Sequence, residues 1–150
     1  MHVIDSFSGP NRFLSNFYRH TITFGDISFP TNEHAFAAWK TTDWDQRRAI
    51  AEASGPKEAK AMGRRLALRE GWDEMSSDVM RLINATKYAD GALRMALLTT
   101  GDALLVEGNI WHDNTWGDCF CGRPACRSEG ENRLGQILMS IRSDLFLEFS

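Results

Sequence analysis

The sequence lacks any long hydrophobic run. Its longest unbroken apolar stretch, residues 35–39, is far shorter than the roughly 20 residues that a membrane-spanning helix needs. Residues 1–6 have neither the basic start nor the apolar centre of a secretory signal peptide. We therefore expect a cytoplasmic protein that has no membrane partner.

Cysteine and net positive charge are also scarce. The three cysteines are an odd number, which makes a poor disulfide framework and leaves reduced thiols or a metal site as alternatives. Lysine and arginine number 17 against 20 acidic residues, a formal charge of −3. That balance argues against a protein that coats duplex DNA through massed positive charge, although a local basic groove remains possible.

What the chain does have is enough apolar material for a core. Of its 150 residues 43% are hydrophobic, with five Trp and nine Phe, which excludes a disordered chain. The sequence shows no internal repeat and no linker long enough to separate one domain from another. We therefore expect one domain spanning residues 1–150.

Periodicity predicts an α+β fold: a single compact, mostly helical domain with a small N-terminal antiparallel β element. We expect β structure over the first 30 residues, with residues 21–24 and 26–29 forming a hairpin around Gly25 and Pro30 ending its second strand. The remaining expectations are a capped helix over 33–40, helices over most of 43–99, a short buried strand at 104–106, a loop-rich stretch over 108–130 and a last helix over 132–146.

Glu33 and Lys40 point to the same side of the first predicted helix, opposite its apolar residues. This pattern fits a solvated face. It also fits a cleft in which the carboxylate steers water or stabilises positive charge and a desolvated lysine becomes nucleophilic. Spacing alone does not choose between the two.

A basic segment follows at residues 57–70, with five cationic and two acidic side chains. Lys57, Lys60 and Arg64 fall on one helix face, where they suit either a solvated surface or an anion site for phosphates.

Aromatic and carboxylate side chains alternate in a predicted loop at residues 111–118. Asp113 could take sugar hydroxyls or an oxocarbenium charge and Trp116 could stack on a ring, or the loop could be purely structural. Residues 11–17 have a similar character, with Arg12 beside amides and phenylalanines.

Three cysteines and a histidine lie close together in the same region of the chain. His112, Cys119, Cys121 and Cys126 could supply four zinc ligands. Because the Cys-x-Cys spacing differs from the usual Cys-x2-Cys knuckle, we expect free thiols and no metal.

Taken together, these segments resemble the NADAR family, the YbiA-like N-glycosidases. The matching segments occur in order along most of the chain: 13–17, 29–36 with Lys40, 59–64, Trp72 and Met80 with Lys87 and Tyr88, 98–101, 105–108, Asp113 with 116–117, and 132–142. One departure is the cysteine-bearing loop after Gly117, where the family pattern leads us to expect a glycine-rich link.

The resemblance implies an α+β fold and hydrolysis of the bond between ribose and a nitrogen, with no cofactor. Implied substrates are ADP-ribose attached to guanine in DNA and phosphorylated riboflavin-pathway intermediates. Such a reaction passes through an oxocarbenium-like transition state, which calls for nearby negative charge, a nucleophile and contacts to hydroxyls and phosphate.

These needs assign roles to the candidate residues. We predict that Glu33, Lys40 and Asp113 are catalytic. We predict substrate contacts from Arg12, Asn16, Phe17, His34, Lys60, Arg64, Trp116 and Gly117. The alternative is a non-catalytic module that binds ADP-ribose or a related nucleotide. Such a module needs hydrogen bonds and stacking, whereas a hydrolase also needs a residue whose loss abolishes turnover with little loss of affinity.

Overall fold

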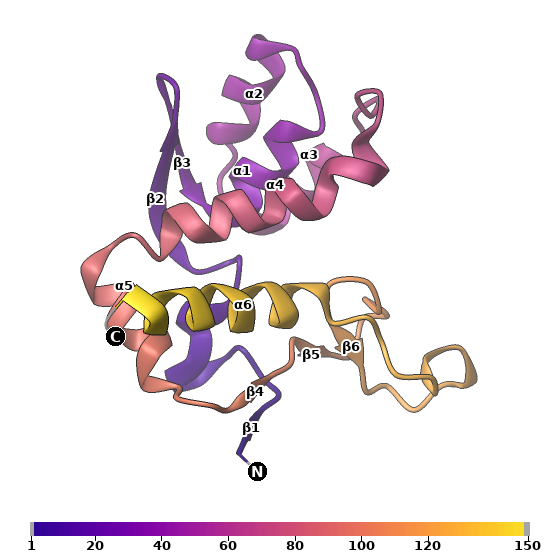
Figure 1. Ribbon diagram of the computed structural model, residues 1–150. Helices are drawn as coiled ribbons and strands as arrows, with labels where there is room; N and C mark the ends of the chain where they lie inside the picture. The colour runs from indigo at the N-terminus through magenta and orange to yellow at the C-terminus, as the bar shows by residue number, and fades with distance from the viewer. Residues whose placement is uncertain (1, 149–150) are drawn as a thin grey trace. The chain divides into compact units, whose positions relative to one another are not determined.

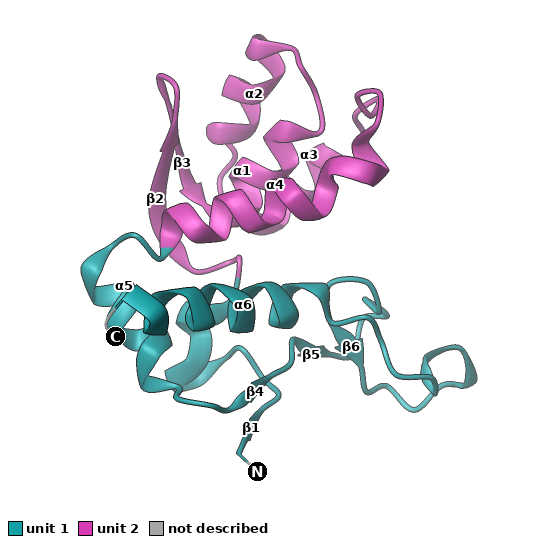
Figure 2. Cartoon of the chain, in the orientation of Figure 1, with its two compact units in different colours: residues 1–15, 88–150 teal, residues 16–87 magenta. Residues whose placement is uncertain are grey.

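A computed structural model describes residues 2–148. The chain has an α+β fold with six α-helices among the described residues and only short strands (Figure 1). It divides into two compact units, one formed by residues 16–87 and the other by residues 1–15 together with 88–150 (Figure 2). We call these the continuous unit and the discontinuous unit.

The continuous unit consists of an antiparallel hairpin and four helices. Its elements are β2 (Arg19–Phe24), β3 (Ile27–Thr31), α1 (Asn32–Trp39), α2 (Trp44–Ala51), α3 (Pro56–Arg64) and α4 (Trp72–Lys87). The hairpin turns at Gly25, which has a φ of +63°, as glycine readily allows. Helix α1 contacts β3 and all three other helices of this unit, so it is buried on most sides.

The discontinuous unit joins both ends of the chain. Its elements are β1 (Val3–Ile4), the 3₁₀ helix η1 (Gly9–Leu14), α5 (Gly91–Thr99), β4 (Leu104–Leu105), β5 (Gly108–Asn109), β6 (Asp118–Cys119), the 3₁₀ turn η2 (Pro124–Cys126) and α6 (Arg133–Glu148). β1 pairs with β4 and β5 with β6, each in parallel. Helix α6 contacts both β4 and α5, and it contributes Leu134 and Leu138 to the core.

The predicted fold class and the hairpin are confirmed, as is the capped helix: the Thr31 hydroxyl accepts a hydrogen bond from the backbone of His34. Two local expectations were wrong. Residues 9–14 form η1 rather than a strand, because Pro10 fixes a helical φ near its start. β3 also continues through Pro30 to Thr31, which the outer edge of a two-stranded hairpin tolerates.

None of the helices among the described residues combines the length and apolar character needed to cross a membrane.

Candidate active site

Glu33 and Lys40 lie on helix α1, which is enclosed within the continuous unit. The Glu33 side chain is only 9% exposed, and Lys40, at the C-terminal end of the helix, is half-buried. The polar side of α1 is therefore not a solvated face, which was one of the two interpretations that the spacing left open.

The surroundings of Lys40 favour its neutral form, with burial as the main cause. Burial lowers the pKa of the Lys40 ammonium, and the positive charges of Arg64 and Lys60 lower it further. The Glu33 carboxylate opposes these effects, because it stabilises the protonated amine. The Lys40 amine thus interacts electrostatically with one carboxylate and two cations, all within the continuous unit.

Helix α3 brings its cations to α1 through a close contact at Gly63. A methyl group added at Gly63 would lie 3.0 Å from Ala37 Cβ and 3.6 Å from Lys40 Nζ. The absence of a side chain at this position lets the two helices approach and sets the Lys40 amine against α3.

Lys60 and Arg64, which we predict to form an anion site, both lie on α3. The Lys60 Nζ lies over the Phe17 ring, 5.9 Å from its centroid, and Arg64 is exposed. Phe17 is itself 43% exposed, so a partly exposed aromatic ring and a cation lie side by side.

His34 is used by the fold. It is completely buried, and its Nδ1 lies 2.7 Å from the Thr31 hydroxyl while Nε2 lies 3.1 Å from the Ala53 carbonyl. The carbonyl can only accept, so Nε2 carries the proton and Nδ1 accepts from Thr31. Burial lowers the pKa of His34. Both ring nitrogens are therefore engaged, and we leave His34 out of the proposed site.

Asn16 belongs to a buried amide network. Its Oδ1 accepts from Asn32 Nδ2 at 3.1 Å, its Nδ2 faces the Met80 sulfur at 3.3 Å, and Asn84 accepts from the same Asn32 amide at 3.0 Å. The Asn16 carbonyl also accepts from the backbone of Glu33 at 3.1 Å. The network fixes the first turn of α1, and hence Glu33. Contact between Asn16 and substrate remains a prediction.

Lys87 was absent from the predicted site. Its side chain is fully buried in the continuous unit, and its Nζ lies 5.4 Å from the centroid of the Tyr18 ring. Burial lowers the pKa of Lys87 to about 7. The signal was present in the sequence, because Lys87 follows Ile83 and Met80 at spacings that place it on the buried face of α4.

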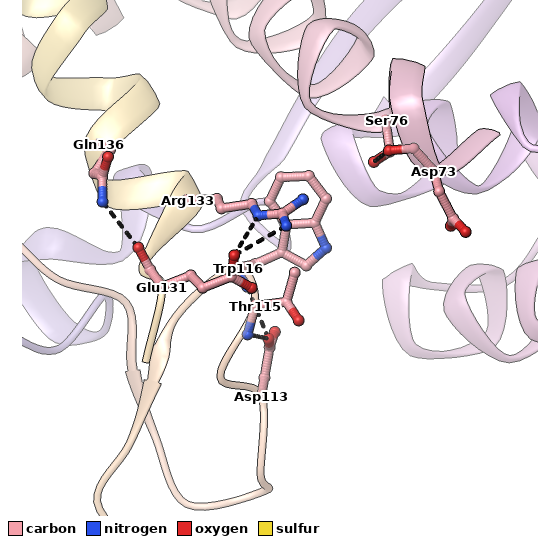
Figure 3. A network of polar contacts seen from close by, with 8 residues as sticks. All are labelled: Asp73, Ser76, Asp113, Thr115, Trp116, Glu131, Arg133 and Gln136. Carbon is pink, nitrogen blue, oxygen red and sulfur yellow. Dashed lines mark hydrogen bonds and ion pairs between the residues drawn. The ribbon is translucent and has the colours of Figure 1, made fainter. Parts of the chain in front are cut away.

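Asp113 and Trp116 lie in the discontinuous unit, where the loop before β6 holds them in a fixed geometry (Figure 3). The Asp113 Oδ1 accepts from the backbone of Thr115 at 3.1 Å and of Trp116 at 2.9 Å. The Arg133 guanidinium lies 5.9 Å from the Trp116 ring centroid and also pairs with Glu131 at 3.0 Å. Asp113 therefore caps this loop, whatever further role it has.

Gly117 and Arg12 complete the predicted set. Gly117 is packed so tightly that an added Cβ would overlap the Glu107 carbonyl oxygen, which no side chain could tolerate. Arg12 is exposed on η1.

The predicted residues thus form two groups. Asn16, Phe17, Glu33, His34, Lys40, Lys60 and Arg64 belong to the continuous unit, whereas Arg12, Asp113, Trp116 and Gly117 belong to the discontinuous unit. That the two groups share one site remains a prediction.

Comparisons with known proteins place this arrangement in context. Residues 5–146 match the family described as the NADAR domain. N-glycosidase YbiA of Escherichia coli (strain K12) is 36% identical over 151 residues, covering 90% of each chain. N-glycosidase Npun_R5314 of Nostoc punctiforme is 38% identical over 88% of this chain and 84% of its own length.

A riboflavin biosynthesis protein of Vibrio vulnificus, VVA0006, is 33% identical over 89% of this chain, which spans only 35% of that longer protein. Among solved structures, the NMR structure of Escherichia coli YbiA matches with a TM-score of 0.81 and 35% identity, over 99% of this chain and 90% of that one. The likeness therefore extends over both units.

Proposed function

The chain belongs to the NADAR domain family, and we propose that it is an N-glycosidase that hydrolyses the bond between a ribose and a nitrogen. The observation that carries the proposal is the buried Glu33 carboxylate set near a half-buried Lys40 amine. The relatives named N-glycosidases, which this chain spans almost completely, support the same reaction class.

Charge development explains why this pair suits the reaction. As the C1′–N bond breaks, its electron pair leaves with the nitrogen and positive charge spreads over the ring oxygen and C1′. A carboxylate held out of water stabilises that charge more strongly than one in solvent. Glu33 meets this requirement, since the amide network fixes its helix turn and little solvent reaches it.

Two routes complete the hydrolysis. In the first, Glu33 takes a proton from water as the water oxygen bonds to C1′ and the C1′–N bond breaks, and Glu33 then passes that proton to the departing nitrogen. In the second, the neutral Lys40 amine bonds to C1′ as the C1′–N bond breaks, and one amine proton passes to the departing base. The bond between C1′ and the ring oxygen then breaks to give a Schiff base, the ring oxygen takes the second amine proton, and addition of water to C1′ releases the sugar and the neutral amine. Neither route transfers electrons to a cofactor.

The substrate class that we propose carries phosphate. Lys60 and Arg64, next to the Lys40 amine, supply the charged donors that phosphate or pyrophosphate oxygens require. The exposed Phe17 ring beside Lys60 offers a stacking surface. ADP-ribose linked to guanine in DNA and a phosphorylated riboflavin-pathway intermediate both have these features, and they are the two substrates to compare.

A product assay tests the proposal. Purified full-length protein is incubated with each of the two substrates, and release of ADP-ribose or ribose phosphate is followed by mass spectrometry. We expect turnover of at least one, reduced about 100-fold or more in Glu33→Gln. Glu70→Gln, an exposed glutamate outside the site, serves as the matched control. Clear nucleotide binding by calorimetry without turnover would instead favour the binding module.

A further inference from the structure

Beyond this activity, the loop between β5 and α6 gathers four classical metal-binding side chains into one small cluster. His112, Cys119, Cys121 and Cys126 place one nitrogen and three sulfurs within 4.8 Å of one another. We propose that this cluster binds one zinc ion in a closed, structural site, contrary to the free thiols that the cysteine spacing led us to expect.

The distances from the histidine nitrogen to the three sulfurs are close to those of a tetrahedral zinc site. His112 Nδ1 lies 3.8 Å from the sulfur of Cys119, 3.6 Å from that of Cys121 and 3.4 Å from that of Cys126. With Zn–S bonds of about 2.3 Å and Zn–N bonds of about 2.0 to 2.1 Å, a tetrahedral ion separates sulfur from nitrogen by about 3.6 Å. The three nitrogen–sulfur distances bracket that value, and the four ligand atoms all lie within 4.8 Å of one another.

The backbone turns sharply to bring these four residues together. His112 has a φ of +71°, a left-handed conformation that costs free energy for any residue other than glycine. Gly122, directly after Cys121, has a φ of +80°. The close Cys-x-Cys spacing, which counted against a metal, is therefore accommodated by left-handed backbone on both sides of β6.

Hydrogen-bond donors also surround the sulfurs as they do in thiolate sites. The Arg123 backbone N–H lies 3.4 Å from the Cys121 sulfur, and the Asn114 amide lies 3.3 Å from that of Cys126. Donors of this kind stabilise the negative charge of a coordinated thiolate and orient the ligand. Asn114 Oδ1 in turn accepts from the backbone of Cys119 at 2.9 Å.

Cysteine-rich N,S donor sets select zinc among the common divalent ions. On binding, each of the three thiols releases its proton to solvent and His112 coordinates through Nδ1 as the neutral imidazole, giving a centre with a net charge of −1. Four protein ligands leave no open position for water or substrate, so the ion has a structural role.

The ion would fasten the loop that carries Asp113 and Trp116. Asn114 connects the cysteine cluster to this loop, because its side chain contacts Cys119 and Cys126. The Asn114 backbone carbonyl accepts a hydrogen bond from the backbone of Glu131, just before α6. The cluster thus lies one residue from the Asp113 cap.

Metal analysis of the full-length protein tests the site. Protein expressed in zinc-supplemented medium is desalted into metal-free buffer, and zinc is measured by elemental mass spectrometry. We expect about one zinc per chain in the wild type and in His2→Ala, whose histidine lies outside the cluster, and less than about one-tenth in Cys121→Ser and His112→Ala.

Thiol chemistry on the wild type keeps the proposal testable if these variants misfold. We expect the three cysteines to resist Ellman's reagent until a chelator and denaturant remove the ion, and Co²⁺ to restore protection with the absorption bands of tetrahedral thiolate coordination. Any of three results would overturn the proposal. The wild type could hold less than one-tenth of a zinc per chain with three freely reactive thiols, it could contain a disulfide, or Cys121→Ser could retain full zinc.

Discussion

Gly63 and Ala37 bring helices α3 and α1 into close contact, since a Cβ at Gly63 would stand only 3.0 Å from that of Ala37. The contact holds the cation-bearing helix α3 against α1 and determines where Lys60 and Arg64 stand relative to Lys40.

Gly63→Ala is therefore expected to destabilise the protein even though alanine favours helices. Overpacking costs about 1 to 3 kcal/mol, and the gain in helix propensity offsets about 1 kcal/mol of it. Urea unfolding should show a net loss of about 1 kcal/mol, and at most about 2 kcal/mol. Gly91→Ala, where a Cβ would meet nothing within 4 Å, is the control and should not lose stability. A Gly63→Ala protein as stable as the wild type would show that α1 and α3 move apart freely.

Lys60→Ala should weaken substrate binding more than it slows chemistry. A phosphate contact made equally in the ground and transition states affects KM, and one charged hydrogen bond corresponds to about a 10- to 100-fold change. Steady-state kinetics should therefore show a raised KM with kcat nearly unchanged. Lys57→Ala, on the exposed first turn of the same helix, is the control and should leave both constants unchanged. An unchanged KM in Lys60→Ala would show that Lys60 is a solvated surface residue that does not bind substrate.

Borohydride reduction during turnover distinguishes the two proposed routes. If Lys40 attacks C1′, reduction traps a covalent adduct with the mass of the sugar portion of the substrate on the wild type and on Lys57→Ala, but not on Lys40→Ala. We expect the adduct, because burial lowers the pKa of Lys40 and raises its neutral fraction. An adduct that maps to Lys60 or Lys87 would keep the chemistry and change the residue. Normal turnover without any adduct would favour direct attack by water.

Lys87 should make folding stability depend on pH. Its pKa of about 7 in the fold lies below its ordinary value near 10.5, so above pH 7 the unfolded chain holds the proton that the folded chain has lost. The free energy of unfolding therefore rises with pH from about 7 to 10, by up to about 1.4 kcal/mol per unit from this group.

The measurement is urea unfolding of the wild type and Lys87→Met at pH 7, 8 and 9. The difference between them isolates Lys87 from other groups that titrate in this range. We expect the wild type to gain stability relative to the variant as pH rises, and Lys57→Met to follow the wild type. Parallel pH curves for wild type and Lys87→Met would show that the buried lysine stays charged.

Asp113 has a structural role that can be separated from its predicted catalytic one. Asp113→Asn keeps an oxygen that can accept from Thr115 and Trp116, whereas Asp113→Ala removes it. We expect the alanine variant to lose about 1 to 2 kcal/mol of stability and the asparagine variant less than about 1 kcal/mol. Turnover should fall in both if the carboxylate charge supports the transition state. An active Asp113→Asn enzyme would leave Asp113 as a cap only.

Local sequence signals predicted the elements that are locally determined. The hairpin follows from alternation around Gly25, and α1 from the capping hydroxyl of Thr31. The parallel pair of β1 and β4 was not predictable, because two-residue strands carry no periodicity and their partners are distant in sequence. The cluster of one histidine and three cysteines likewise depends on tertiary folding. The spacing between the cysteines does not predict it, because left-handed backbone at His112 brings the imidazole close to the three sulfurs.

The pairing of Val3 with Leu104 also bears on the order in which the chain folds. During synthesis strand β1 emerges about a hundred residues before its partner β4, so the discontinuous unit remains incomplete until the residues after Leu104 have been made. Residues 16–87 have no such dependence, because their unit is continuous and its contacts are available as soon as α4 has emerged. The contacts of the unit that carries Glu33 and Lys40 are therefore complete first. The cysteine-bearing loop completes the other unit later.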